Sequence, residues 1–229
     1  MKLRIALYQV RIITYNSLLP CNLLSYLLPS ALCLLPYCSQ SVSIQPNLIL
    51  AIAAPTDLDS VVYQKVQEVL EKLAQSQSEQ IELLPIVNPA TPEAIDAVLE
   101  QQPHIFHFIG HGCLNNETGK EIGQIALVDD VFEEALWVDA GFFGGLFNRY
   151  RPGIVMLQAC EGGMLSASQA FVGVASKIVQ QNIPVVVAMQ YEVSNITASC
   201  FAYRFYERLA QDDPVDLAAQ NGRRAIANF

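Results

Sequence analysis

Short, continuous apolar runs alternate with amphipathic segments from about residue 47 onwards. The runs predict buried strands, because strands covered on both faces carry apolar side chains at successive positions. The segments between them repeat apolar residues every three to four positions, the period of a helix packed on one side. Strands are predicted at 47–55, 81–87, 104–112, 153–160 and 183–191. Helices are predicted at 61–75, 91–101, 140–150, 168–181, 197–211 and 213–229.

This alternation predicts an α/β fold, in which helices cover both faces of a mostly parallel sheet. Residues 113–124 form a longer polar excursion after the third predicted strand. Residues 125–130 and 135–140 follow, and we expect them to pair as a hairpin. In parallel sheets, functional side chains gather beyond the carboxyl ends of the strands, near the point where strand order reverses.

The first 45 residues follow a different pattern. The segment Ser17–Tyr37 is a run of 21 residues without charge, and basic residues precede it, as in a signal anchor. Three prolines interrupt the run, and each would kink or break a helix. A signal peptide, a membrane anchor, a partner-binding segment and a mistaken upstream start all stay open. We therefore divide the chain into an apolar segment, 1–45, and a globular domain, 46–229.

Composition narrows the classes of function. Apolar residues make up 52% of the chain and charged residues 15%, which favours a large buried core. The net charge of −9 and the lack of a basic run argue against nucleic-acid binding. The six cysteines show no C-x-x-C pair and no repeated spacing, so they predict neither a disulfide framework nor a zinc site. We expect a reducing, cytoplasmic location, with membrane anchoring through residues 17–37 as the alternative.

Two reactive side chains follow predicted strands: His111 in "IFHFIGHG" and Cys160 in "IVMLQACEGG". Neighbouring glycines let the backbone turn sharply and leave each side chain facing a cleft. A cysteine alone is more often a small buried hydrophobe, and it needs a base or a positive charge to become a thiolate. If the two strands are neighbours, about 4.8 Å apart, His111 can serve as that base.

The same strand ends offer donors for an oxyanion. The amide N–H groups of Gly112 and Cys160 would point into the space between the two side chains. Two such donors suit the tetrahedral intermediate of acyl transfer. His107 lies inside the strand and is interpreted as a core histidine, while His104 falls on the opposite face, so we expect no metal site. No strand is followed by a glycine-rich nucleotide-binding motif, which weakens a nucleotide-binding interpretation.

The motif "HFIGHG" followed by "VMLQACEGG" resembles the CHAT domain, a branch of the caspase-like cysteine peptidases. The resemblance extends from about Asn47 to near the C-terminus. It implies a caspase-like three-layer α-β-α sandwich with strand order 2-1-3-4-5. It also implies a catalytic dyad of His111 and Cys160, an oxyanion hole at Gly112, and a protein or peptide substrate cleaved without metal or organic cofactor.

Specificity rests on weaker signals. In relatives that cleave after Arg or Lys, an acid in the loop after the first strand helps to line the primary pocket. Here that loop contains Asp57 and Asp59, which either favour a basic substrate residue or cap the helix that starts near Ser60. Gln158, two residues before Cys160, either lines the pocket or satisfies backbone groups.

The sequence also departs from the family pattern. The family continues after its last helices into a strand containing Trp, whereas the only Trp here is Trp137. We therefore expect an edge strand to be missing and the chain to be a fragment. The leading interpretation is a cysteine endopeptidase, with a regulatory or sensor protein as a further partner. The alternative is a catalytically inactive caspase-like module for interaction or signalling.

Overall fold

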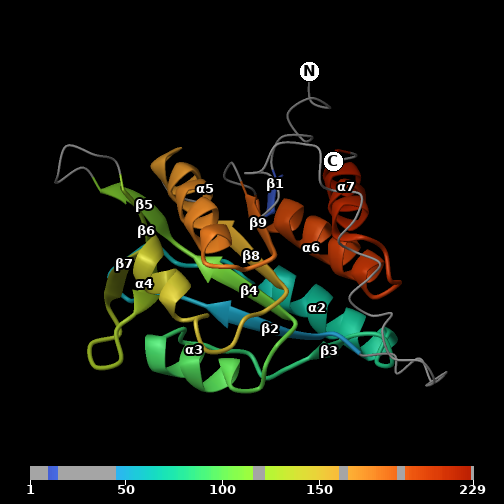
Figure 1. The fold of residues 1–229 in the computed structure, drawn as a ribbon, viewed down its shortest axis with the longest axis horizontal. Helices are drawn as coiled ribbons and strands as arrows, with labels where there is room; N and C mark the ends of the chain where they lie inside the picture. Colours follow the sequence, from blue (N-terminus) through green and yellow to red (C-terminus); the bar gives the residue numbers. More distant parts are fainter. Residues whose placement is uncertain (1–9, 15–44, 116–121, 160–164, 190–193, 228–229) are drawn as a thin grey trace.

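A computed structural model describes residues 10–14, 45–115, 122–159, 165–189 and 194–227. A six-stranded sheet lies at its centre, in the order β1-β9-β8-β4-β2-β3 (Figure 1). Its strands are β1 (Val10–Thr14), β2 (Asn47–Ile52), β3 (Glu82–Leu83), β4 (Ile105–Gly110), β8 (Ile154–Ala159) and β9 (Val185–Met189). All pairs are parallel except β1 with β9. The five parallel strands therefore have the predicted order 2-1-3-4-5.

Helices cover both faces of this sheet, as the alternating pattern predicts. They are α2 (Gln64–Ser76), α3 (Pro92–Leu99), α4 (Ala140–Gly145), α5 (Leu165–Gln180), α6 (Asn195–Leu209) and α7 (Val215–Ile226). One core packs α3, α4 and α5 against the sheet, and the other packs α2, α6 and α7 against the opposite face. The predicted N-cap of α3 is confirmed, because the Thr91 hydroxyl accepts a hydrogen bond from the Ala94 amide at 3.1 Å.

A second, antiparallel sheet extends from the end of β4. It contains β5 (Gly112–Asn115), β6 (Ile122–Val128) and β7 (Ala135–Asp139), and β6 and β7 form the predicted hairpin. Both ends of the polar excursion over 113–124 are strands, since β5 and the start of β6 lie there. The residues at both ends are polar, so they carry no local apolar pattern that would predict a strand. They are strands because β5 and the start of β6 pair with each other.

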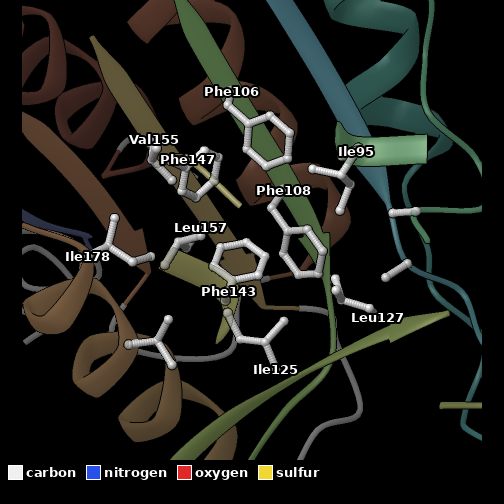
Figure 2. Close-up of a cluster of buried hydrophobic side chains, with 14 of the residues drawn as sticks. Ile95, Phe106, Phe108, Ile125, Leu127, Phe143, Phe147, Val155, Leu157 and Ile178 are labelled. Atoms are coloured by element: carbon white, nitrogen blue, oxygen red, sulfur yellow. The ribbon is translucent and has the colours of Figure 1, made fainter. Parts of the chain in front are cut away.

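The core beneath α4 and α5 is built around phenylalanines (Figure 2). Phe106 packs edge-on against Phe147 with ring centroids 5.2 Å apart, and Phe108 packs edge-on against Phe143 at 5.3 Å. Edge-to-face packing of this kind adds to the free energy gained from burial. Since Phe106 and Phe108 come from β4, the central strand is held firmly on this face.

The opposite face of β4 carries a buried histidine. His107 is inaccessible to solvent, and its Nε2–H donates to the Gln158 side-chain oxygen at 3.1 Å. Burial lowers the pKa of His107 to about 4, because desolvation disfavours the charged imidazolium. The interpretation of His107 as a core residue is therefore confirmed.

The contact between β6 and α5 gives a test of packing. A Cβ added at Gly123 would lie 2.7 Å from the carbonyl oxygen of Ala170, whereas one added at Gly173 would meet no atom within 4 Å. We expect Gly123→Ala to lower the free energy of unfolding by about 1–3 kcal/mol through overpacking. Gly173→Ala should raise it by up to about 1 kcal/mol, because alanine favours the helix. Urea unfolding measures both, and equal stabilities would contradict the packing.

His107 makes stability depend on pH. The unfolded chain binds more protons at His107 than the folded chain between pH 6.5 and about pH 4, so stability falls as the pH drops through this window. We expect a loss of about 2 kcal/mol between pH 7 and pH 5 from this residue. The His107→Gln protein keeps a side-chain donor at this position but has no group that titrates there. It should therefore lose less stability between pH 7 and pH 5. Urea unfolding at the two pH values tests this, and equal losses in both proteins would contradict it.

Candidate active site

The ends of β4 and β8 lie side by side at one edge of the sheet, and each is the residue before a predicted catalytic position. Gly110 and Ala159 are partners in the parallel ladder between these strands. His111 and Cys160 are the next residues along the chain on either side. Cys160 itself lies outside the described residues, as does the neighbouring Glu161. The structure therefore places His111 and the strand that leads to Cys160.

His111 is held by a backbone group of another loop. Its side chain is 8% exposed, and its Nε2 lies 2.8 Å from the carbonyl oxygen of Asp59. A carbonyl oxygen can only accept a hydrogen bond, so Nε2 carries the proton in this contact. In the neutral ring the lone pair then lies on Nδ1. His111 thus presents Nδ1 as the nitrogen that can take a proton.

The amide of Gly112 points away from β6. Ala126 donates its N–H to the His111 carbonyl at 3.0 Å, so His111 and Ala126 form a hydrogen-bonded pair of the antiparallel ladder. Gly112 and Ile125 are the next partners, and such pairs alternate between bonded and non-bonded. The Gly112 N–H is therefore not used by β6 and faces the opposite side of its strand.

The loop after β2 contains the two predicted specificity residues. Asp57 and Asp59 both have exposed side chains. An Asp57 carboxylate oxygen accepts a hydrogen bond from the Ala135 amide at 2.7 Å, at the start of β7. The alternative role of these acids, capping the next helix, is wrong. That helix begins at Gln64, and no side chain caps it.

Gln158 is buried within β8 rather than exposed. It is 2% exposed, and its side-chain oxygen accepts the hydrogen bond from His107. The bond joins a side chain of β4, four residues before His111, to a side chain of β8, two residues before Cys160. Gln158 thus bonds one ring nitrogen of a buried histidine, a contact that neither of its two sequence-based interpretations included.

No metal centre is evident in the part of the chain that the structure describes. Among those residues, no group of three or more His, Cys, Asp or Glu side chains is arranged to hold a metal ion. His104 lies at the opposite end of β4 from His111 and bonds to Asn47. The three histidines of "HIFHFIGH" therefore have separate environments.

An acidic cavity lies further along the same edge of the sheet. Its volume is about 480 Å³, and it is lined by the loop after β3 and by the tip of the β6–β7 hairpin. Asp129, Asp130 and Glu133 contribute carboxylates to the lining. Next to them, the pKa of Glu93 is raised, because its protonated carboxyl donates a hydrogen bond to the Asp130 carboxylate. This edge of the domain therefore carries a concentrated negative charge.

The segment 17–37, the predicted membrane contact, lies outside the described residues. None of the described helices is long and apolar enough to cross a membrane. The N-terminal part of the chain nevertheless contributes to the domain, because β1 pairs along β9 at the edge of the sheet. Sequence reasoning missed this strand.

Comparison with known proteins places the chain in a family. A search of curated proteins gave no match. Among solved structures, the chain is similar to the Drosophila initiator caspase Dronc, with 15% identity and a TM-score of 0.33. That alignment covers 51% of this chain and 48% of the caspase, about half of its length. The family model of the CHAT domain matches residues 21–228. The chain therefore belongs to the CHAT domain family.

Proposed function

We propose that the chain is a cysteine endopeptidase in which His111 and Cys160 form the catalytic dyad. The observation that carries this proposal is the hydrogen bond from His111 Nε2 to the carbonyl oxygen of Asp59. It leaves Nδ1 as the proton acceptor, at the sheet edge where the strand leading to Cys160 ends. Membership of the CHAT family supports the same assignment.

The first half of the reaction forms an acyl-enzyme. The Cys160 thiol transfers its proton to His111 Nδ1, and the thiolate sulfur attacks the carbonyl carbon of the scissile peptide bond. Negative charge develops on the carbonyl oxygen, where the N–H groups of Gly112 and Cys160 act as donors. Each such donor contributes about 3–4 kcal/mol to transition-state stabilisation. The His111 imidazolium then protonates the leaving nitrogen, and the C–N bond breaks.

The second half releases the new carboxyl terminus. A water molecule gives a proton to His111 Nδ1 as its oxygen attacks the thioester carbon. The carbon–sulfur bond breaks, and the thiolate regains a proton from His111. The Asp59 carbonyl keeps its hydrogen bond to Nε2 throughout, which stabilises the imidazolium that appears twice in this cycle.

The substrate is a protein cut after a basic residue. Asp59 has an exposed carboxylate in the loop that holds His111, and Asp57 lies two residues before it. Residues 73–148 contain twelve Asp or Glu and a single Lys, so the field on this side of the domain attracts cations. Gln158 lies on the strand that leads to Cys160, and its bond to His107 links this strand to the one that leads to His111.

Alkylation tests the dyad without a known substrate. We expect Cys160 to react with iodoacetamide well below the ordinary thiol pKa of about 8.5, because His111 stabilises the thiolate. His111→Ala should return the pKa of Cys160 towards that ordinary value. Peptide mapping over a pH series separates Cys160 from Cys113 and Cys200, which are half-buried and serve as internal controls. Burial raises the pKa of Cys113, so it should react only at higher pH.

A Cys160 that reacts like Cys200 in both proteins would contradict the proposal. The same result would favour the inactive interaction module, because the fold would be present without an activated nucleophile.

Peptide substrates test the basic preference. We expect Asp59→Asn to lower kcat/KM about 3- to 10-fold for a peptide with Arg before the scissile bond. The matched peptide with citrulline, which has the same shape without the charge, should change little. The substitution leaves the Asp59 carbonyl in place, so the hydrogen bond to His111 is retained. The Cys160→Ala protein measures the background rate of cleavage. If Asp59→Asn lowers kcat/KM equally for the Arg and citrulline peptides, Asp59 does not contribute to the basic preference.

A further inference from the structure

The loop that holds His111 is itself held by the β6–β7 hairpin. After β2, the loop residues Thr56 and Asp57 bond to this hairpin, and Asp59 bonds to His111. Only Leu58 separates the two sets of contacts. A shift at one set is therefore transmitted to the other over a very short length of backbone.

The first contact uses a backbone oxygen of the hairpin turn. The amide and the hydroxyl of Thr56 both donate to the carbonyl oxygen of Glu133, at 2.8 and 3.1 Å. Glu133 has a φ of 57°, in the left-handed region that non-glycine residues seldom adopt. Asp129 closes the turn by accepting hydrogen bonds from the amides of Val131 and Phe132, each at 2.9 Å. These hydrogen bonds within the turn fix its conformation independently of its contact with the loop.

The second contact uses a charged side chain. The carboxylate of Asp57 accepts the Ala135 N–H at 2.7 Å, where β7 begins. A hydrogen bond to a carboxylate is shorter and stronger than one between neutral groups. The side chain is exposed and belongs to neither apolar core. Its structural contribution is thus local to the junction between loop and hairpin.

We propose that Asp57 is a positioning residue for His111, acting through the Asp59 carbonyl. By fixing the loop to β7, Asp57 holds that carbonyl where it accepts the Nε2 proton and so keeps the lone pair of the neutral ring on Nδ1. Its role in catalysis rests on the proposed function, whereas its effect on the His111 tautomer does not. This role differs from direct contact with a basic substrate residue, which depends on charge rather than on a hydrogen-bond acceptor.

Two substitutions separate these roles. Asp57→Ala removes the acceptor and the charge, whereas Asp57→Asn removes the charge but keeps an oxygen that can accept from Ala135. Asp96→Ala is the matched control, because it deletes an exposed carboxylate from α3 in the same acidic half of the domain. Thr56→Val is a second variant at the junction and removes one of the two bonds to Glu133.

The first measurement is the tautomer of His111, followed by long-range ¹H–¹⁵N NMR of histidine-labelled protein and assigned with His111→Gln. We expect the Nε2–H form in the wild type, in Asp57→Asn and in Asp96→Ala. In Asp57→Ala we expect a mixture of tautomers, and in Thr56→Val a smaller change of the same kind. An unchanged tautomer in both Asp57→Ala and Thr56→Val, or a wild type without the Nε2–H form, would overturn the proposal.

The second measurement is the reactivity of the site. We expect Asp57→Ala to slow both Cys160 alkylation at pH 7 and kcat for the Arg peptide roughly 10- to 100-fold, with little change in KM, because misplaced catalytic groups lose rate in the chemical step. Asp57→Asn should restore kcat to within about threefold of the wild type. If Asp57→Asn is as slow as Asp57→Ala, or if only KM changes, Asp57 acts through its charge and the positioning role is wrong.

The two proposals fail in different ways. A wild-type Cys160 that reacts as an ordinary thiol contradicts the endopeptidase. The NMR comparison still decides whether Asp57 orients His111, since it needs neither Cys160 nor a substrate.

Discussion

The parallel pairing of β4 with β2 on one side and β8 on the other is the constraint on which the site depends. The ladder sets Gly110 beside Ala159 and Ile52 beside Ile109, so three strand ends meet at one edge. Since side chains alternate along a strand, a slip of one residue in either pairing would turn the following side chains to the wrong face. The phenylalanines of β4 oppose such a slip, because their rings fit a single arrangement beneath α4 (Figure 2).

The two faces of the sheet differ in chemistry. Under α4 and α5 the core of described residues is aromatic and aliphatic, whereas the face under α6 also buries His107, Gln158 and Tyr206. The Tyr206 hydroxyl donates to the sulfur of Met156 at 3.0 Å, and its burial raises its pKa well above the ordinary value. Buried polar groups stabilise little in net terms, but each is costly when its partner is lost. They therefore fix one register between β4 and β8, on the face that leads to the catalytic positions.

Sequence reasoning located the parallel strands and His111 because both leave local signals: continuous apolar runs, and a histidine between glycines at the end of one of them. It missed β1, whose five residues are recognisable as a strand only through their pairing with β9, far along the chain. The contact that orients His111 was equally invisible, because the acceptor is the backbone carbonyl of Asp59, and every residue has one. For Asp57, the family resemblance pointed to charge, whereas the folded chain uses the side chain as a hydrogen-bond acceptor.

The outermost strands bear on how the domain behaves in a crowded solution. β3 contributes two residues to one border of the sheet and is followed by Pro85, which has no amide hydrogen to offer. At the other border, β1 contributes five residues and runs against the direction of β9. A two-residue border with a proline shortly after it is a poor template for strands of neighbouring molecules, so the sheet resists edge-to-edge aggregation on the β3 side. The apolar strands β2, β4, β8 and β9 are each paired on both sides and present no free edge to other chains.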